Sequence, residues 1–302
     1  MIPSDVLAAV SVAVVWGLTF IAIKVGVAET SPLMLSALRF LFAAFPAVLF
    51  VRPPKARPWK VALYGLLLGA GQFGLLFMAI HAGFPIGLAS LVIQAQAFFT
   101  VALAWVFLRE FPRRVQVIGG IVAFAGIAVL GSARFVGASL GPFALVVLAS
   151  FFWGSANVLA KTAGKVDMLA FTVWSSLAAP LPLIALSLVV DGAAPLAGLS
   201  HPTLRLVASV LVVAYAGTIF GFGLWARLLS HYSAATVAPF ALLVPVVGMV
   251  AGAVVFGEPL RPVELAGGVL VMAGLALNVL GDGLLRRALS TRWIHARHQS
   301  HS

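Results

Sequence analysis

This sequence contains no cysteine and few charged residues. None of its 302 residues is cysteine, and only 9% are charged. Without cysteine the chain has no disulfide, no thiolate metal site and no cysteine nucleophile. Soluble globular chains carry roughly a quarter charged residues, whereas here 62% of the residues are hydrophobic and the mean hydropathy is +1.13. This composition argues against a cytosolic enzyme, a nucleic-acid-binding protein and a disordered chain, and it indicates a membrane protein.

Long apolar runs without charge fill most of the chain. About 20 apolar residues form a helix that crosses a bilayer, and the backbone of each span must satisfy its own hydrogen bonds there. The runs do not alternate between apolar and polar residues, as the strands of a membrane barrel would. We therefore predict an all-α membrane protein with ten transmembrane helices. They are expected near Val6–Ile23, Pro32–Val51, Val61–Ile80, Ile86–Leu108, Val115–Leu130, Gly141–Ala160, Met168–Val190, Leu206–Ala226, Ala234–Phe256 and Val263–Gly281.

The basic residues are divided unevenly between the two sides of these spans. Lys and Arg collect in short cytoplasmic loops of membrane proteins. With a cytoplasmic N-terminus, fourteen of the 19 basic residues lie on the cytoplasmic side, and only Arg134, Arg205 and Arg261 lie on the other. This bias predicts cytoplasmic N- and C-termini and a basic cytoplasmic tail over residues 284–302. It also explains the net charge of +11 without a polyanionic ligand, although contact with anionic lipid headgroups is expected.

The two halves of the sequence resemble each other in order and spacing. Each half contains Trp-Gly and, after six intervening residues, a Lys. A GxxxGxG pattern, a Glu, and two adjacent glycines with a third six residues after the second follow in both halves. The matching positions are Trp16, Gly17, Lys24, Gly65, Gly69, Gly71, Glu110, Gly119, Gly120 and Gly126 in the first half, and Trp153, Gly154, Lys161, Gly217, Gly221, Gly223, Glu258, Gly267, Gly268 and Gly274 in the second. We predict two repeats of five helices each, over residues 1–134 and 135–283. Because five is odd, the second repeat enters the membrane upside down.

Inverted repeats are typical of secondary transporters, which bind substrate near the middle of the membrane between the halves. A passive channel or a membrane scaffold is the alternative for the same duplication. No GxxxxGK[ST] motif is present, which argues against ATP-driven transport by this chain alone, and no histidine spacing supports a metal site. We therefore expect a carrier with a central cavity, without a cofactor, a bound metal or an enzymatic activity.

Polar side chains inside the spans are costly and tend to face a cavity. All eight acidic residues lie at span ends or in loops, so no carboxylate relay for protons is expected in mid-membrane. Other polar and aromatic residues of the spans are candidates for binding substrate, and the alternative for each is that it only joins helices. The candidates are Trp16, Thr19, Arg39, Gln72, Gln94, Gln96, Trp153, Asn157 and Tyr215.

Position along the helices refines some of these candidates. Gln94 and Gln96 are two residues apart, about 200° around an α-helix, so only one of them is expected to face the cavity. Asn157 lies four residues after Trp153, on the same helix face. Together with Trp16, these residues predict aromatic walls with a few amide groups, suited to a small zwitterion.

Three basic side chains have two interpretations each. Arg39 lies well inside the second span, where its planar guanidinium either binds a substrate carboxylate or reaches towards the membrane surface; binding in the cavity is slightly favoured. Lys24 and Lys161 end their helices near opposite faces of the membrane. We expect them to act mainly as anchors that extend to the lipid headgroups, with gating or attraction of the substrate as the alternative.

Short motifs extend over essentially the whole chain. They are VWGL at 15–18 with KVG at 24–26, PLML at 32–35 with LRF at 38–40, GLASLV at 87–92 continued by QAQAFFT at 94–100, AP at 238–239 and LVPVVG at 243–248. With these motifs the chain resembles EamA-type members of the drug/metabolite transporter superfamily, and the QAQAFFT stretch is most similar to the O-acetylserine/cysteine exporters. The resemblance implies a ten-helix inner-membrane exporter, with both termini cytoplasmic, that moves amino acids and related metabolites by alternating access.

The main hypothesis is therefore a secondary exporter of small amino acids and related metabolites. Cysteine and O-acetylserine are the substrates that the resemblance favours, and threonine and aromatic amino acids are transported by other relatives. A multidrug or metabolite exporter of the same fold, and a passive channel or scaffold, are the alternatives. The expected partners are a small-molecule substrate and membrane lipid, but no nucleic acid. A monomer is sufficient because one chain contains both halves, and a homodimer is the alternative.

Overall fold

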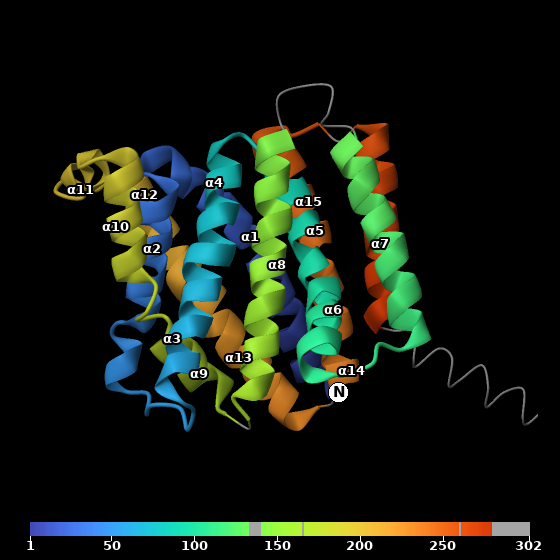
Figure 1. The fold of residues 1–302 in the computed structure, drawn as a ribbon. Helices are drawn as coiled ribbons and strands as arrows, with labels where there is room; N and C mark the ends of the chain where they lie inside the picture. Colours follow the sequence, from blue (N-terminus) through green and yellow to red (C-terminus); the bar gives the residue numbers. More distant parts are fainter. Residues whose placement is uncertain (133–139, 165, 233, 260, 280–302) are drawn as a thin grey trace, which may run out of the picture.

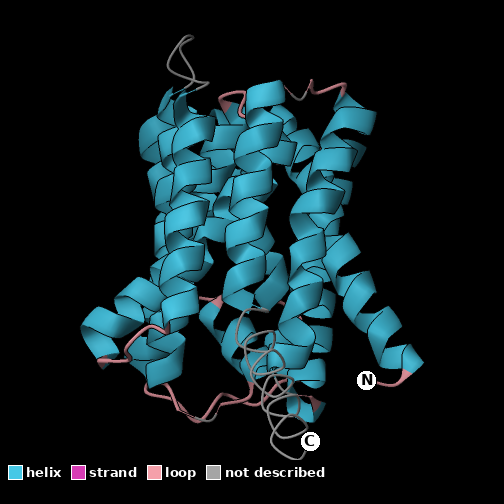
Figure 2. Ribbon diagram, turned by 90° about the vertical axis from the view of Figure 1, so that its right-hand side faces the viewer, coloured by secondary structure: helices cyan, strands magenta, loops and turns pink. Residues whose placement is uncertain are grey.

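The computed structural model describes residues 1–132, 140–164, 166–232, 234–259 and 261–279, and these ranges contain helices and no strand (Figure 1, Figure 2). Ten of the described helices are long and apolar enough to cross a membrane, which confirms the predicted fold class. The predicted repeat boundary at 134/135 and the tail 284–302 lie outside the described residues. The spans are Pro3–Glu29, Pro32–Leu49, Pro58–His81, Ile86–Leu108, Arg114–Ser132, Leu140–Thr162, Met168–Asp191, Leu204–Trp225, Ala238–Phe256 and Pro262–Val279.

Several spans consist of more than one helical segment. The last span, Pro262–Val279, carries no label in Figure 1. The labelled helices are α1 (Pro3–Glu29), α2 (Pro32–Ala44), α3 (Pro58–Leu66), α4 (Leu75–His81), α5 (Ile86–Val92), α6 (Gln96–Leu108), α7 (Arg114–Ser132), α8 (Leu140–Thr162), α9 (Met168–Ser175), α10 (Pro180–Asp191), α11 (Ala194–Gly198), α12 (Leu204–Leu211), α13 (Gly221–His231), α14 (Ala234–Val237) and α15 (Leu243–Phe256).

Irregular helical turns interrupt the same spans in both halves. The third and eighth spans contain π-helical segments, Leu67–Gly74 and Val212–Phe220. The fourth and ninth spans contain 3-10 segments, Ile93–Ala95 and Ala238–Leu242. Such turns change the rotation per residue, and π segments are often found at functional sites. They redirect side chains that a regular helix would place elsewhere.

The sequence accounts for where the helices begin and end. Proline occupies the first turn of α1, α2 and α3, where its missing N–H is not needed by the helix. Ser31 caps α2 by accepting a hydrogen bond from the Met34 amide at 3.2 Å, which satisfies one of the free donors at that end. The helices α6 and α15 both end on a left-handed residue, Arg109 with φ 58° and Gly257 with φ 60°. Each of these is followed directly by a glutamate.

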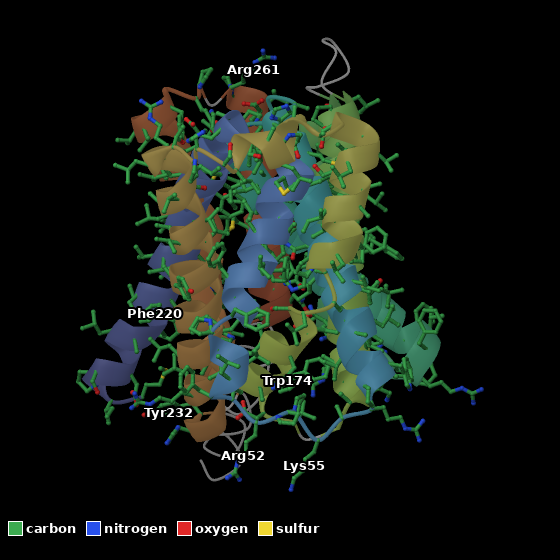
Figure 3. The ribbon with its side chains drawn as sticks, turned by 90° about the vertical axis from the view of Figure 1, so that its left-hand side faces the viewer. Arg52, Lys55, Trp174, Phe220, Tyr232 and Arg261 are labelled. Carbon is green, nitrogen blue, oxygen red and sulfur yellow. The ribbon has the colours of Figure 1, made fainter. Side chains whose placement is uncertain are left out.

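The bundle has two ends, which the labelled residues of Figure 3 distinguish. Arg52, Lys55 and Tyr232 lie at the end where α1 begins, hereafter the N-terminal face, and Arg261 lies at the opposite end, the far face. Large apolar side chains cover the outside of the bundle, as in Val189, which is 83% exposed. An apolar surface of this extent needs lipid to cover it.

Glycine allows α7 and the last span to touch along their backbones at one edge of the bundle (Figure 1). A Cβ atom added to Gly119 would lie 2.7 Å from the carbonyl oxygen of Gly274, and one added to Gly126 would lie 2.7 Å from that of Gly267. Small residues permit this close approach of membrane helices. The two contacts are equivalent in the predicted repeat, because Gly119 corresponds to Gly267 and Gly126 to Gly274.

Candidate functional site

A cavity of about 880 Å³ lies within the bundle, in the size range of small-molecule sites. Side chains from both predicted repeats line it. Eight of the nine predicted site residues are among them. The sequence suggested each of these residues separately, and the structure brings them together around one cavity. They are Trp16, Thr19, Arg39, Gln72, Gln94, Gln96, Trp153 and Asn157.

Tyr215 is the predicted site residue that the structure places outside this cavity. It lies in the π-helical segment of the eighth span, and its hydroxyl donates a hydrogen bond to the Phe45 carbonyl at 3.2 Å. Tyr215 was predicted only because a polar side chain lies in this span, and it is not among the residues that line the cavity. In the wider turn, Val213 and Gly217 line the cavity instead.

Arg39 is buried in α2, with 4% of its surface exposed. Its Nε and Nη2 both donate to Thr218 Oγ1, at 3.3 and 3.1 Å. Its guanidinium carbon lies 3.3 Å from the centroid of the Phe73 ring, a cation–π contact. No carboxylate among the described residues forms an ion pair with it. Arg39 therefore lines the cavity rather than extending to the membrane surface.

Both Gln94 and Gln96 line the cavity, so the expectation that only one of them would face it was wrong. The 3-10 segment Ile93–Ala95 lies between α5 and α6 at this point. In a 3-10 helix with three residues per turn, side chains two residues apart point in directions that differ by about 120°. In an α-helix the same spacing gives a difference of about 160°. Gln94 Nε2 donates to the Ala241 carbonyl at 3.5 Å, whereas Gln96 Oε1 accepts from Asn157 Nδ2 at 2.7 Å.

Aromatic rings form much of the cavity wall. Trp16 lies 5.4 Å from Phe222 and 5.3 Å from Trp225, measured between ring centroids. Its indole N–H donates to the Gly217 carbonyl at 2.9 Å. Phe222 and Trp225 were not predicted, although their spacing of three residues places them on one helix face. Thr218, which orients Arg39, was also missed, because one threonine in an apolar span carries little signal.

The cavity opens at the N-terminal face. The exposed residues Met168 and Arg227 line it there, as does Asp167. Asp167 Oδ1 accepts hydrogen bonds from the first amides of α9, so part of its carboxylate is already engaged. Near this opening, Tyr232 donates a hydrogen bond to Asp5 at 2.7 Å. This bond stabilises the protonated phenol and raises the pKa of Tyr232.

At the far face, Glu258 joins both halves of the chain and is not among the residues that line the cavity. Its carboxylate forms an ion pair with Lys24 at 2.7 Å and accepts hydrogen bonds from the amides of Ile86 at 3.1 Å and Gly87 at 3.3 Å. A carboxylate at the start of α5 is favoured by the unpaired N–H groups there. Lys24 was expected mainly to reach the headgroups, and its ion pair within the bundle corrects that expectation.

Lys161 also forms an ion pair rather than acting only as an anchor. Its Nζ lies 2.6 Å from Glu110 Oε2 at the N-terminal face. Both side chains are about half exposed, at 47% and 52%. Lys161 corresponds to Lys24, and Glu110 to Glu258, in the predicted repeat.

The sequence pattern of the EamA-like transporter family matches residues 4–132 and again residues 141–280. The chain belongs to this family. Membership places it among multi-pass membrane transporters rather than enzymes, as the sequence predicted. The two matches correspond closely in extent to the two predicted repeats, whose inverted arrangement they do not test.

Relatives of this EamA-family chain are named as exporters. It is 42% identical to a protein of Salmonella typhimurium named "Probable amino-acid metabolite efflux pump", over 93% of this chain and 96% of the relative. A protein of Escherichia coli with the same name is 40% identical, over 92% and 95%. A "Probable terminal-alkyne amino-acid exporter" of Streptantibioticus cattleyicolor is 31% identical, over 87% and 89%.

A solved crystal structure whose description names no function aligns with a TM-score of 0.60. It covers 92% of this chain and 96% of its own, at 18% identity. At that identity the likeness concerns the fold alone. Within the described ranges, no group of three or more His, Asp or Glu side chains could hold a metal ion.

Proposed function

We propose that this EamA-family protein is a secondary exporter of small amino acids and related metabolites, working by alternating access. The observation that carries the proposal is the central cavity, which opens at the N-terminal face, while Glu258 joins the two halves at the far face. Because the cavity has one opening, a substrate bound in it is exposed to one side of the membrane at a time. A passive channel would need a continuous path.

Matching contacts in the two halves support the proposed inverted repeat over residues 1–134 and 135–283. The Lys24–Glu258 and Lys161–Glu110 pairs join corresponding positions. The closest neighbour of a Cβ added to Gly17 is Val247, and that of a Cβ added to Gly154 is Phe99, at 2.6 and 2.8 Å. These positions also correspond. A pair of related halves that rock about a shared axis is the arrangement by which such repeats alternate access.

The proposed orientation places the N-terminal face, and both termini, in the cytoplasm of a cell with this protein in its inner membrane. It rests on the excess of Lys and Arg on that side of the spans. The structure then corresponds to an inward-open state that is ready to load substrate. We propose that a monomer surrounded by lipid performs transport, since the cavity is built within one chain.

Counterflow in proteoliposomes tests this function. Vesicles containing the protein are loaded separately with cysteine, O-acetylserine, threonine or phenylalanine, and uptake of the labelled compound is followed. We expect transient accumulation above equilibrium for one or more of them. Flux without accumulation would indicate a channel, and no flux would indicate either a scaffold or an exporter of other metabolites or drugs. A lysine substitution, Arg39→Lys, should weaken transport while leaving the protein folded.

A further inference from the structure

Gln72 has an unused hydrogen-bond acceptor in the wall of the cavity. Only 2% of its surface is exposed, and its Oε1 atom has no partner within the described part of the chain. Buried polar atoms are nearly always bonded, and leaving one unbonded costs about 1–3 kcal/mol. Gln96, by contrast, already accepts from Asn157. Gln72 lines the cavity, whereas Oε1 itself exposes less than 1 Å², so a ligand in the cavity supplies the missing donor once the Gln72 amide turns towards it.

Arg39 has unused donors in the same cavity. A guanidinium carries five N–H donors, and the hydrogen bonds of Arg39 in the described structure go to one oxygen, Thr218 Oγ1. The rest of the group lies against the ring of Phe73. A buried charge without a counterion is unfavourable, and a carboxylate would satisfy it through two parallel hydrogen bonds.

The packing of α2 against the π-helical segment Leu67–Gly74 places these two groups on adjoining helices. Ser36, one turn before Arg39, donates to the Gly69 carbonyl at 3.3 Å. Gly69 is three residues before Gln72 in the same helical segment, and Phe73 directly follows Gln72. A free donor and a free acceptor of this kind match an α-amino acid, whose carboxylate and ammonium are attached to the same carbon.

We propose that Arg39 binds the carboxylate of the substrate and Gln72 Oε1 accepts a hydrogen bond from its ammonium group. The substrate class is then a free α-amino acid, with an apolar or small side chain against the aromatic walls. Derivatives in which either group is blocked are rejected. This inference rests on the proposed function and adds to it which chemical groups the cavity recognises.

The test uses the amino acid that gives the largest counterflow, together with its N-acetyl derivative, which lacks the ammonium, and its amide, which lacks the carboxylate. Each derivative competes with the labelled amino acid for uptake into proteoliposomes. A charged hydrogen bond contributes about 1.5–3 kcal/mol, so each derivative should compete roughly 10- to 100-fold more weakly.

Two variants should each remove one half of this selectivity. In Arg39→Gln, the amide should compete as well as the amino acid, while the N-acetyl derivative is still rejected. In Gln72→Leu, the N-acetyl derivative should compete as well as the amino acid, while the amide is still rejected. Gln72→Glu should improve competition by the cationic amide relative to the zwitterionic amino acid, because the added carboxylate attracts a net positive charge and repels the carboxylate of the amino acid. Gln116→Leu on α7, outside the cavity, is the matched control and should keep both preferences.

The outcomes separate the inference from the function. If the wild-type protein transports amino acids and their blocked derivatives equally, the inference is wrong and the exporter function stands. If it transports no amino acid, both are wrong. If Arg39→Gln and Gln72→Leu lower all uptake in proportion, the residues are structural and the inference is overturned. Should Arg39→Gln fail to fold, Arg39→Lys replaces it, with a smaller loss of preference for the carboxylate.

Discussion

The two ends of the molecule carry the same ion pair in different surroundings. At the far face, Lys24 and Glu258 are 2.7 Å apart, with side-chain exposures of 33% and 10%. At the N-terminal face, Lys161 and Glu110 are 2.6 Å apart, with exposures of 47% and 52%. The distances are nearly equal, so the ion pair itself does not distinguish a closed end from an open one.

The difference lies in what else the glutamate binds. Glu258 also accepts hydrogen bonds from the Ile86 and Gly87 amides at the start of α5, in the other half of the chain. Among the described residues, the Glu110 carboxylate is bonded to Lys161 and accepts no hydrogen bond from backbone amides of the other half. The two ends therefore differ in the attachment of the glutamate to a helix N-terminus, whereas the lysine is present at both.

The largest effect should come from neutralising Glu258, which removes the ion pair with Lys24 and weakens the charge-assisted bonds from the Ile86 and Gly87 amides. Breaking a buried ion pair costs about 3–5 kcal/mol, and an exposed pair contributes about 0–1 kcal/mol. Because Lys24 is one-third exposed, we expect about 2–3 kcal/mol for Glu258→Gln and less than 1 kcal/mol for Glu110→Gln. The closed state of the far face should become correspondingly less populated in Glu258→Gln.

Labelling of a single introduced cysteine measures this change, because the sequence itself contains no cysteine. Ile23→Cys places a thiol at the inner end of the cavity, where Ile23 is 2% exposed. A membrane-impermeant reagent added on the far side should label it at least about tenfold faster in Glu258→Gln and within about twofold in Glu110→Gln. Equal acceleration by the two variants would contradict the assigned difference between the faces.

Exchanging the charges gives an intermediate effect. The double variant Lys161→Glu/Glu110→Lys should be nearly as stable as the wild type, since both groups face solvent. Lys24→Glu/Glu258→Lys should recover only part of the stability, because a lysine cannot accept from Ile86 and Gly87 and is disfavoured at a helix N-terminus. The residual loss should be about 1–2 kcal/mol, measured by thermal unfolding in detergent. Full recovery at the far face would show that the amides contribute nothing to closure.

The smallest difference is expected where the two ends are alike. Gly119→Ala and Gly267→Ala alter corresponding contacts between α7 and the last span, where a Cβ would meet backbone or side-chain atoms at 2.7 and 2.8 Å. Both should destabilise the protein by a similar amount, about 1–3 kcal/mol. Gly120→Ala, with its closest neighbour at 3.5 Å, is the control. Clearly unequal losses in the first two variants would argue against the repeat.

Hydropathy and spacing predict most of the fold because the membrane imposes length and composition on each span. The candidate site was predictable to the extent that polar side chains in such spans must face a cavity or another helix. Gln72 and Asn157 follow from that rule. Tyr215 and the Gln94–Gln96 pair do not, because their directions depend on π and 3-10 turns, which apolar sequence does not specify. The partner of Arg39 was also beyond prediction, because Thr218 lies 179 residues away in sequence.

The buried guanidinium of Arg39 also has an electrical consequence. A cavity that opens to one side takes the electrical potential of that side, and one elementary charge experiences about 2.3 kcal/mol per 100 mV. In the proposed orientation, a voltage that is negative inside the cell stabilises the empty, cationic cavity in its inward-open form. The resting membrane voltage would therefore return the unloaded carrier to the side where substrate is made, before any substrate gradient acts on it.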